Sequence, residues 1–168
     1  MSFSIREVFP EDAAEILEYL KTVGGETDNL TFGAEGMPAS VEDERMFIES
    51  ISESCNSAMF VCIDDEEVVA LASVNGNLRE RLKHRASVAI SVRKSHWGRG
   101  IGSEMMRKLI EFSSVSGIEI LSLEVRSDNL RAIGLYKKFG FQKIGSFKGF
   151  FKIDGEYIDF DLMNLYIG

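Results

Sequence analysis

The chain has 168 residues, of which 45% are hydrophobic and 27% are charged, as in ordinary globular proteins with a substantial core. No apolar run approaches the roughly 20 residues that span a bilayer, and the N-terminus lacks the plan of a signal peptide, so we expect a cytoplasmic protein without a membrane partner. The net charge of −8 argues against nucleic acid as the main partner.

Hydrophobic periodicity predicts seven strands and four helices without a linker or repeat, so we expect one domain over residues 1–168. Glycines 24 and 25 are expected to end the first helix, and the segment Asn75–Asn77 is expected to break a strand. Hairpins join some strands and a helix crosses between others, which indicates an α/β fold with a mixed sheet. In chain order the predicted elements are a strand over Phe3–Phe9, helices over Ala13–Thr22 and from the cap Ser40 to about Glu53, strands over Ala58–Ile63, Val68–Val74 and Ala86–Val92, a helix over Gly102–Ser116, a strand over Ile118–Val125, a helix from the cap Ser127-Asp128-Asn129 to Gly140, and a hairpin of Phe141–Ile153 with Tyr157–Tyr166.

Cysteine and histidine are too few to indicate a metal site. Neither the pair Cys55 and Cys62 nor the pair His84 and His96 has the spacing of zinc ligands. We therefore expect no metal. Both thiols are expected to be free and buried, because cysteine is among the most buried residue types.

A glycine-rich turn lies between the predicted strand Ala86–Val92 and the predicted helix Gly102–Ser116. Gly98, Gly100 and Gly102 alternate through it, and glycine lets a backbone approach a ligand closely and adopt positive φ. The helix that follows presents unpaired N–H groups and the positive end of its dipole. This turn is therefore expected to bind an anion.

Three other interpretations of the turn are weaker. A nucleoside-triphosphate loop ends in Gly-Lys-Ser/Thr, whereas this turn continues Gly102-Ser103-Glu104. A dinucleotide turn requires a glycine where Ser103 stands, and only Glu124, about 20 residues further on, favours it. A turn without a ligand is disfavoured by the three alternating glycines and by the flanking cations Arg93 and Arg99.

Two segments carry a family resemblance. The segment Arg93–Ser103 resembles the acetyl-CoA loop of the GCN5-related N-acetyltransferases, Arg/Gln-x-x-Gly-x-Gly/Ala. Gly100 and Gly102 match its small positions, while Trp97 stands where Arg or Gln is usual. The segment Asn129–Phe141 resembles the family's Asn-x-x-Ala-x-x-x-Tyr-x-x-x-Gly-Phe, a more specific motif. The resemblance spans nearly the whole chain.

The resemblance implies a single N-acetyltransferase domain with a GNAT-like fold. Its mixed, mostly antiparallel sheet of six or seven strands would be flanked by about four helices, with acetyl-CoA where the strands Ala86–Val92 and Ile118–Val125 splay apart. The residues implied to contact acetyl-CoA are Ile90, Ser91, Val92, Trp97, Gly98, Arg99, Gly100, Ile101, Gly102, Ser103, Asn129, Ala132 and Tyr136.

The resemblance also implies catalytic roles. Acyl transfer to an amine needs a polarised thioester, a proton for the leaving thiolate and reactants held in line. Backbone N–H groups around Ser91 would polarise the thioester oxygen, Asn129 would bind the cofactor arm and could also cap a helix, and Tyr136 would act as the general acid. A free phenol titrates near 10, so Tyr136 can donate a proton at neutral pH.

The general base is the least defined role. Glu124, on the strand after the turn helix, is one candidate, and Glu26 and Glu35 in the N-terminal loop are others. A water-mediated route, or no dedicated base, is preferred to Glu124. His96, inside the turn, is expected to help bind phosphate rather than to act as a base.

Charge is divided unevenly along the chain. Residues 1–83 carry 6 Lys and Arg against 18 Asp and Glu, a net −12, whereas residues 84–168 carry 13 against 9, a net +4. In the family the acceptor is bound mainly by the N-terminal half, so a small cationic amine is the first expected acceptor, unless the acidic half serves only solubility. The alternatives are a protein N-terminal or lysine acetyltransferase, and an acyl-CoA sensor without turnover. Many relatives are dimers, so a homodimer is expected.

Overall fold

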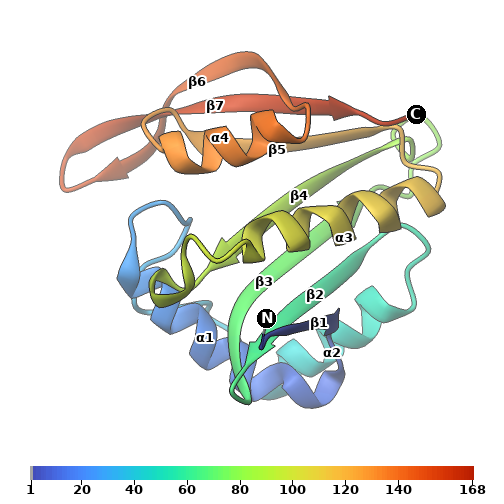
Figure 1. Ribbon diagram of the computed structural model, residues 1–168, viewed down its shortest axis with the longest axis vertical. Coiled ribbons are helices and arrows are strands. Elements are labelled where there is room, and N and C mark those ends of the chain that lie inside the picture. Colours follow the sequence, from blue (N-terminus) through green and yellow to red (C-terminus); the bar gives the residue numbers. More distant parts are fainter. Residues whose placement is uncertain (1) are drawn as a thin grey trace.

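The computed structural model describes residues 2–168, and it is built on one seven-stranded sheet (Figure 1). The strand order is β1-β2-β3-β4-β5-β7-β6, and all neighbours are antiparallel except β4 and β5, which are parallel. The mixed, mostly antiparallel sheet expected from the resemblance is confirmed. The strands are β1 (Ser4–Glu7), β2 (Ala58–Asp64), β3 (Glu67–Gly76), β4 (Arg85–Val92), β5 (Ile120–Arg126), β6 (Gln142–Ile153) and β7 (Glu156–Tyr166).

Helices cover both faces of the sheet (Figure 1). In β2, Met59 and Val61 pack with residues of α1 and α2, whereas Phe60 and Cys62 belong to the core cluster that includes residues of α3 and α4. Successive strand residues point to opposite faces, so α1 and α2 lie on one face and α3 and α4 on the other. None of the helices within residues 2–168 is long and apolar enough to cross a membrane. The helices are α1 (Ala13–Glu26), α2 (Val41–Ser52), α3 (Ile101–Val115) and α4 (Leu130–Lys138), with short 3-10 turns η1 (Pro10–Asp12) and η2 (Lys94–His96).

The two central strands diverge soon after they meet. β4 and β5 pair in parallel only from Arg85 opposite Ile120 to Ser87 opposite Ser122. Beyond Ser87, β4 continues to pair with β3 alone, and β5 pairs with β7 alone. The predicted splay between these strands is therefore present, and one edge of β4 has no strand partner there.

Helix α1 runs further than its glycines suggested. It ends at Glu26, so the prediction that Gly24 and Gly25 end it is wrong. Gly24 instead allows the loop to pack closely on the helix, because a Cβ atom at this position would lie 2.0 Å from the carbonyl oxygen of Gly33. The loop between α1 and α2 thus crosses directly over the helix backbone.

Two smaller predictions also need correction. Strand β3 is not broken at Asn75, because it continues to Gly76, which pairs with Ala86. Cys62 is buried as expected, but Cys55 is exposed, so the prediction of two buried thiols is wrong for that residue. Cys55 lies in the connection between α2 and β2, outside either hydrophobic cluster.

We expect Gly24→Ala to destabilise the protein, because the new methyl group meets backbone that cannot move without displacing the loop. Overpacking of this kind costs about 1–3 kcal/mol. Gly134→Ala in α4 is the matched control, since nothing lies within 4 Å of a Cβ there and the change improves helix propensity by up to ~1 kcal/mol. Thermal and urea denaturation should show Gly24→Ala below and Gly134→Ala at or above the wild type. Equal stability of the two variants contradicts the loop contact.

Candidate active site

The free edge of β4 forms one wall of a cavity. The N–H of Arg93 donates to the carbonyl of Val69 at 2.9 Å, and backbone groups alternate in direction along an antiparallel strand. The N–H and C=O groups of Ile90 and Val92 therefore point away from β3, into the splay. From this side the indole Nε1 of Trp97 donates to the carbonyl of Val92 at 2.9 Å. The N–H groups of Ile90 and Val92 remain without a strand partner.

The glycine turn leads into an uncapped helix. Gly98 and Gly100 have φ of 75° and 84°, in the left-handed region that favours glycine. Gly102 serves another purpose, since a Cβ there would lie 3.1 Å from Leu135, and its absence lets α3 approach α4. No side chain caps the N-terminus of α3 at Gly100. The first N–H groups of α3 are thus open to an anion.

A buried carboxylate anchors this turn to the sheet. Asp64, at the end of β2, accepts hydrogen bonds from Ser2 Oγ (2.9 Å), His96 Nε2 (3.0 Å) and Arg99 Nη1 (3.1 Å). The bond from Ser2, followed by those from His96 and Arg99, lowers the pKa of Asp64 against the opposing effect of burial. The guanidinium of Arg99 is therefore engaged at Asp64. His96 is held there as well, although it still lines the cavity.

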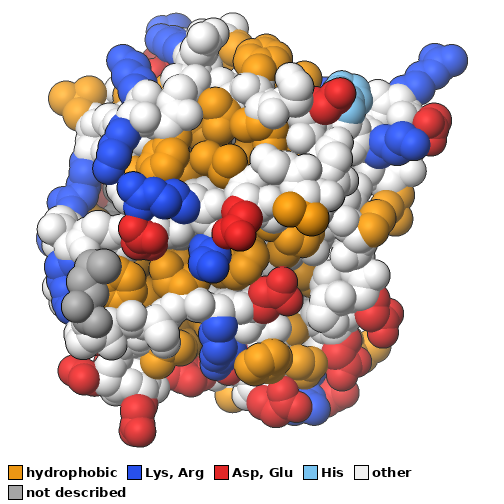
Figure 2. Space-filling view, turned by 45° about the vertical axis from the view of Figure 1, so that its right-hand side comes forward, with side chains coloured by type: hydrophobic (Ala, Val, Ile, Leu, Met, Phe, Trp, Pro, Cys, Tyr) orange, Lys and Arg blue, Asp and Glu red, His pale blue; other side chains and the backbone are white. Residues whose placement is uncertain are grey.

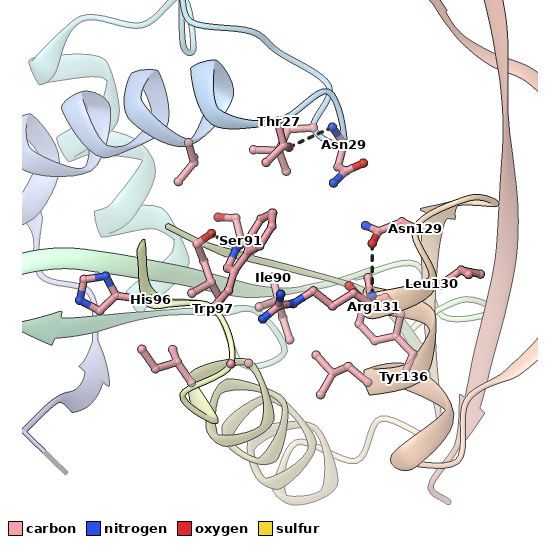
Figure 3. A pocket seen from close by; sticks show the side chains of 18 of the residues that line it. Thr27, Asn29, Ile90, Ser91, His96, Trp97, Asn129, Leu130, Arg131 and Tyr136 are labelled. Carbon is pink, nitrogen blue, oxygen red and sulfur yellow. Dashed lines mark hydrogen bonds between the residues drawn. The ribbon is translucent and has the colours of Figure 1, made fainter. Parts of the chain in front are cut away.

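Trp97 connects the turn to α4. Its indole is held by Val92, and the guanidinium carbon of Arg131 lies 4.6 Å from the centre of its ring. Figure 3 shows the side chain of Arg131 extending from α4 toward Trp97. Trp97 thus supports an arginine from the second motif, at the position where the family usually has Arg or Gln.

The N-terminal half of α4 supplies two polar groups. Asn129 Oδ1 accepts the N–H of Ala132 at 3.2 Å, so Asn129 caps the helix as predicted, and its amide NH2 is left for other partners. Tyr136 lies almost two turns later, buried against Phe141 with ring centres 5.8 Å apart. Burial raises the pKa of Tyr136 to about 12. The phenol therefore stays protonated throughout the neutral and mildly alkaline range.

The opposite wall comes from α1 and the loop that follows it. In Figure 3, Thr27 and Asn29 lie across the cavity from Asn129 and Trp97. The loop is tied to β5, because Arg126 donates to the backbone carbonyl of residue 28 at 3.2 Å.

Helix α1 is itself tied to the region around β4. The hydroxyl of Tyr19 donates to the carbonyl of Ser91 at 2.9 Å and lies 3.0 Å from its Oγ. Glu26 accepts the backbone N–H of Lys94 at 3.2 Å. The wall formed by α1 is thereby fixed relative to the strand that forms the opposite wall.

These walls enclose a cavity of about 660 Å³. It brings together most of the residues singled out in the sequence. Of the residues implied to contact acetyl-CoA, Arg99 does not line it, because its side chain pairs with Asp64. The candidate bases Glu26, Glu35 and Glu124 do not line it either, and Glu124 is exposed on β5. The predicted residues that line the cavity are Ile90, Ser91, Val92, Trp97, Gly98, Gly100, Ile101, Gly102, Ser103, Asn129, Ala132 and Tyr136.

Comparison with known proteins bears directly on this arrangement. The model of the acetyltransferase (GNAT) family matches residues 26–141, which include both the turn and the helix that carries Tyr136. The chain belongs to the GNAT acetyltransferase family.

Individual relatives agree with this assignment. The chain is 31% identical over 117 residues to the L-amino acid N-acetyltransferase AaaT of Escherichia coli (strain K12), covering 69% of this chain and 72% of that protein. The fold is similar to the crystal structure of the GNAT-family acetyltransferase from Streptococcus pneumoniae, with a TM-score of 0.95, 29% identity and 99% of each chain covered. It is also similar to yncA from Salmonella typhimurium, solved with its cofactor acetyl-CoA, with a TM-score of 0.86, 18% identity and coverage of 100% of this chain and 95% of that chain.

Three residues of this GNAT acetyltransferase were not singled out from the sequence. Arg131 lies inside the second motif but at one of its variable positions. Tyr19 and Arg126 carry no motif at all, because their contacts join segments 72 and 98 residues apart. Arg131 could have been found as a cation near the capping Asn129, whereas the roles of Tyr19 and Arg126 require the tertiary structure.

We expect Asn129→Ser to separate the two roles of Asn129. Serine caps a helix about as well as asparagine, but it lacks the amide NH2. The variant should keep the wild-type melting temperature and bind CoA about tenfold more weakly, the effect of one lost hydrogen bond. Asn129→Ala should lose about 1 kcal/mol of stability as well. Calorimetric titration with CoA and thermal melts measure both; unchanged affinity in Asn129→Ser leaves only the capping role.

Proposed function

We propose that this enzyme transfers the acetyl group of acetyl-CoA directly to the primary amine of a small molecule. The observation that carries the proposal is a single cavity where the free edge of β4, the uncapped N-terminus of α3 and Tyr136 come together. These features suit, in turn, an amide-bearing arm, a diphosphate and a leaving thiolate.

Acetyl-CoA would be held mainly by backbone groups. Its diphosphate would lie at the turn Trp97–Ser103, where the N–H groups and dipole of α3 favour an anion. The pantetheine arm would lie along β4 as an added strand does, exchanging hydrogen bonds with Ile90 and Val92. The amide of Asn129 would donate to the arm from the other side of the splay.

The transfer then needs few side chains. The amine nitrogen attacks the thioester carbon, the N–C bond forms, and the C–S bond breaks. A free N–H of β4 stabilises the developing negative charge on the oxygen, a contribution typically of roughly 10²–10³ in rate. Tyr136 donates its proton to the thiolate and recovers one from solvent.

No side chain is assigned as the general base. Asp128 is the one carboxylate among the described residues that line the cavity, and it is bound to Arg126 at 2.8 Å. Glu124, Glu26 and Glu35 are not part of the lining. The amine would therefore lose its proton to water, which was one of the routes left open by the sequence.

The acceptor is proposed to be an amino acid or a molecule of similar size. The loop tied down by Arg126 limits the room above the splay, and the relative AaaT acts on L-amino acids by name. Figure 2 shows acidic side chains gathered over the lower part of the molecule, where Figure 1 places α1 and α2. They do not line the cavity, where the one carboxylate, Asp128, is paired with Arg126, so the lining does not favour the cationic amine expected from charge alone.

A panel of acceptors tests this proposal. We expect thiol release from acetyl-CoA with free L-amino acids, and at least tenfold lower kcat/KM with polyamines and with peptides that offer an N-terminal amine or lysine. Fastest turnover of polyamines would restore the cationic acceptor, and fastest turnover of peptides would indicate a protein acetyltransferase. CoA binding without turnover of any amine would indicate a sensor.

We expect Tyr136→Phe to lower kcat by about 10²-fold or more, because it removes the general acid, while the KM for acetyl-CoA changes little. Since the pKa of Tyr136 is raised to about 12, activity that depends on its protonated form is lost only as pH rises through that value, so the wild-type profile should not fall up to pH 10. Tyr166→Phe, an exposed tyrosine at the far end of β7, is the control. Unchanged kcat and pH profile in Tyr136→Phe would remove the tyrosine from the mechanism.

A further inference from the structure

Arg131 is held in a defined position beside the glycine turn. Its guanidinium carbon lies 4.6 Å from the centre of the Trp97 ring, within the range of a cation–π contact. The ring is fixed at its edge by the hydrogen bond from the indole Nε1 to the carbonyl of Val92, at 2.9 Å. The backbone of β4 thus positions the tryptophan, and the tryptophan positions the arginine.

This position lies over the turn itself. A Cβ atom at Gly98 would be 3.8 Å from an Nη atom of Arg131. Arg131, Trp97 and Gly98 all line the cavity, and Figure 3 shows the arginine reaching across from α4 toward Trp97. The guanidinium therefore stands close to the open N–H groups at the start of α3.

The charge of Arg131 is not neutralised by the protein. The neighbouring arginines are paired: Arg93 with Glu67 at 3.2 Å, Arg99 with Asp64 at 3.1 Å, and Arg126 with Asp128 at 2.8 Å. Within residues 2–168, Arg131 has neither an acidic partner within 4.0 Å nor a side-chain hydrogen bond. It is the one unpaired arginine that this part of the chain presents to the cavity.

We propose that Arg131, held on the face of Trp97, is the cationic side chain that binds the diphosphate of CoA in this enzyme. The inference rests on the proposed function, because it requires CoA to occupy the cavity. The inference also gives Trp97 a role. Trp97 stands where the family usually has Arg or Gln, and it supports the guanidinium of Arg131 from α4 instead of donating to the phosphates itself. The fork of N–H donors of an arginine suits a diphosphate.

The test is calorimetric titration of the full chain with three ligands: CoA, dephospho-CoA, which keeps the diphosphate, and pantetheine, which lacks it. In Arg131→Gln we expect affinity for CoA and for dephospho-CoA to fall about tenfold or more, the usual effect of losing a charge-assisted hydrogen bond. Affinity for pantetheine should stay unchanged. Arg81→Gln removes the same charge from an exposed site in the connector before β4 and should bind all three ligands as the wild type does.

Trp97 supplies a second, independent variant. Trp97→Ala removes the support of the guanidinium and should weaken CoA binding in the same ligand-selective way. If the arginine acts through this stack, the double variant Trp97→Ala/Arg131→Gln should lose less affinity than the sum of the single losses. Additive losses would overturn the part assigned to Trp97. Thermal melts of each variant, with and without CoA, separate loss of binding from loss of folding.

Each remaining outcome has a distinct meaning. A loss limited to CoA, with dephospho-CoA unaffected, would overturn the diphosphate assignment in favour of the 3′-phosphate. An equal loss for pantetheine would reduce Arg131 to a structural role. Wild-type binding in Arg131→Gln would overturn the inference alone, whereas failure of the wild type to bind CoA would overturn the proposed function itself.

Discussion

The parting of β4 and β5 after Ser87 sets the conditions for the rest of the molecule. A buried backbone N–H without a partner costs about 1–3 kcal/mol, so an unpaired strand edge inside a sheet must face water, a side chain or a ligand. Trp97 satisfies the carbonyl of Val92, while the N–H groups of Ile90 and Val92 stay open. The fold thus leaves unpaired backbone groups along this edge, where we propose that the amide-bearing arm of CoA binds.

Most arginines around this edge form ion pairs within the protein. The buried Asp64 pairs with Arg99, and Asp128 pairs with Arg126. Both pairs stiffen the walls, the first by anchoring the turn and the second by fixing the strand end beside α4. Among the arginines and helix ends that line the cavity, the guanidinium of Arg131 and the N-terminus of α3 remain for an anion, and both lie at the same end of the cavity.

Hydrogen bonds hold the wall formed by α1 and its loop against the wall formed by β4. Tyr19 holds α1 to Ser91 of β4, and Glu26, at the end of α1, holds the backbone of Lys94. The loop beyond α1 is bound by Arg126. These bonds hold α1 and its loop against β4 and β5, so the loop that packs closely over Gly24 also forms a wall of the site.

Much of the fold follows from local patterns in the sequence. Alternating hydrophobic residues define β2 to β5 within a few residues, the three glycines mark the turn, and Asn129 marks the start of α4, because periodicity, positive φ and helix capping depend on near neighbours. The uncapped start of α3 and the position of Tyr136 follow from the same signals together with the family motifs. Helix α1 is the exception, since its glycines accommodate a loop that the local pattern does not contain.

The sequence by itself determined the α/β order, the glycine turn before α3, and the asparagine and tyrosine of the second motif. Only the tertiary structure decided which side chains face the cavity. It turned Arg99 toward Asp64, 35 residues away, left Glu124 exposed, and placed Arg131 on Trp97. The physical reason is that a charged side chain is oriented by the partner it meets across the fold, and the partners here are brought together by strand pairing and helix packing between segments far apart in the chain.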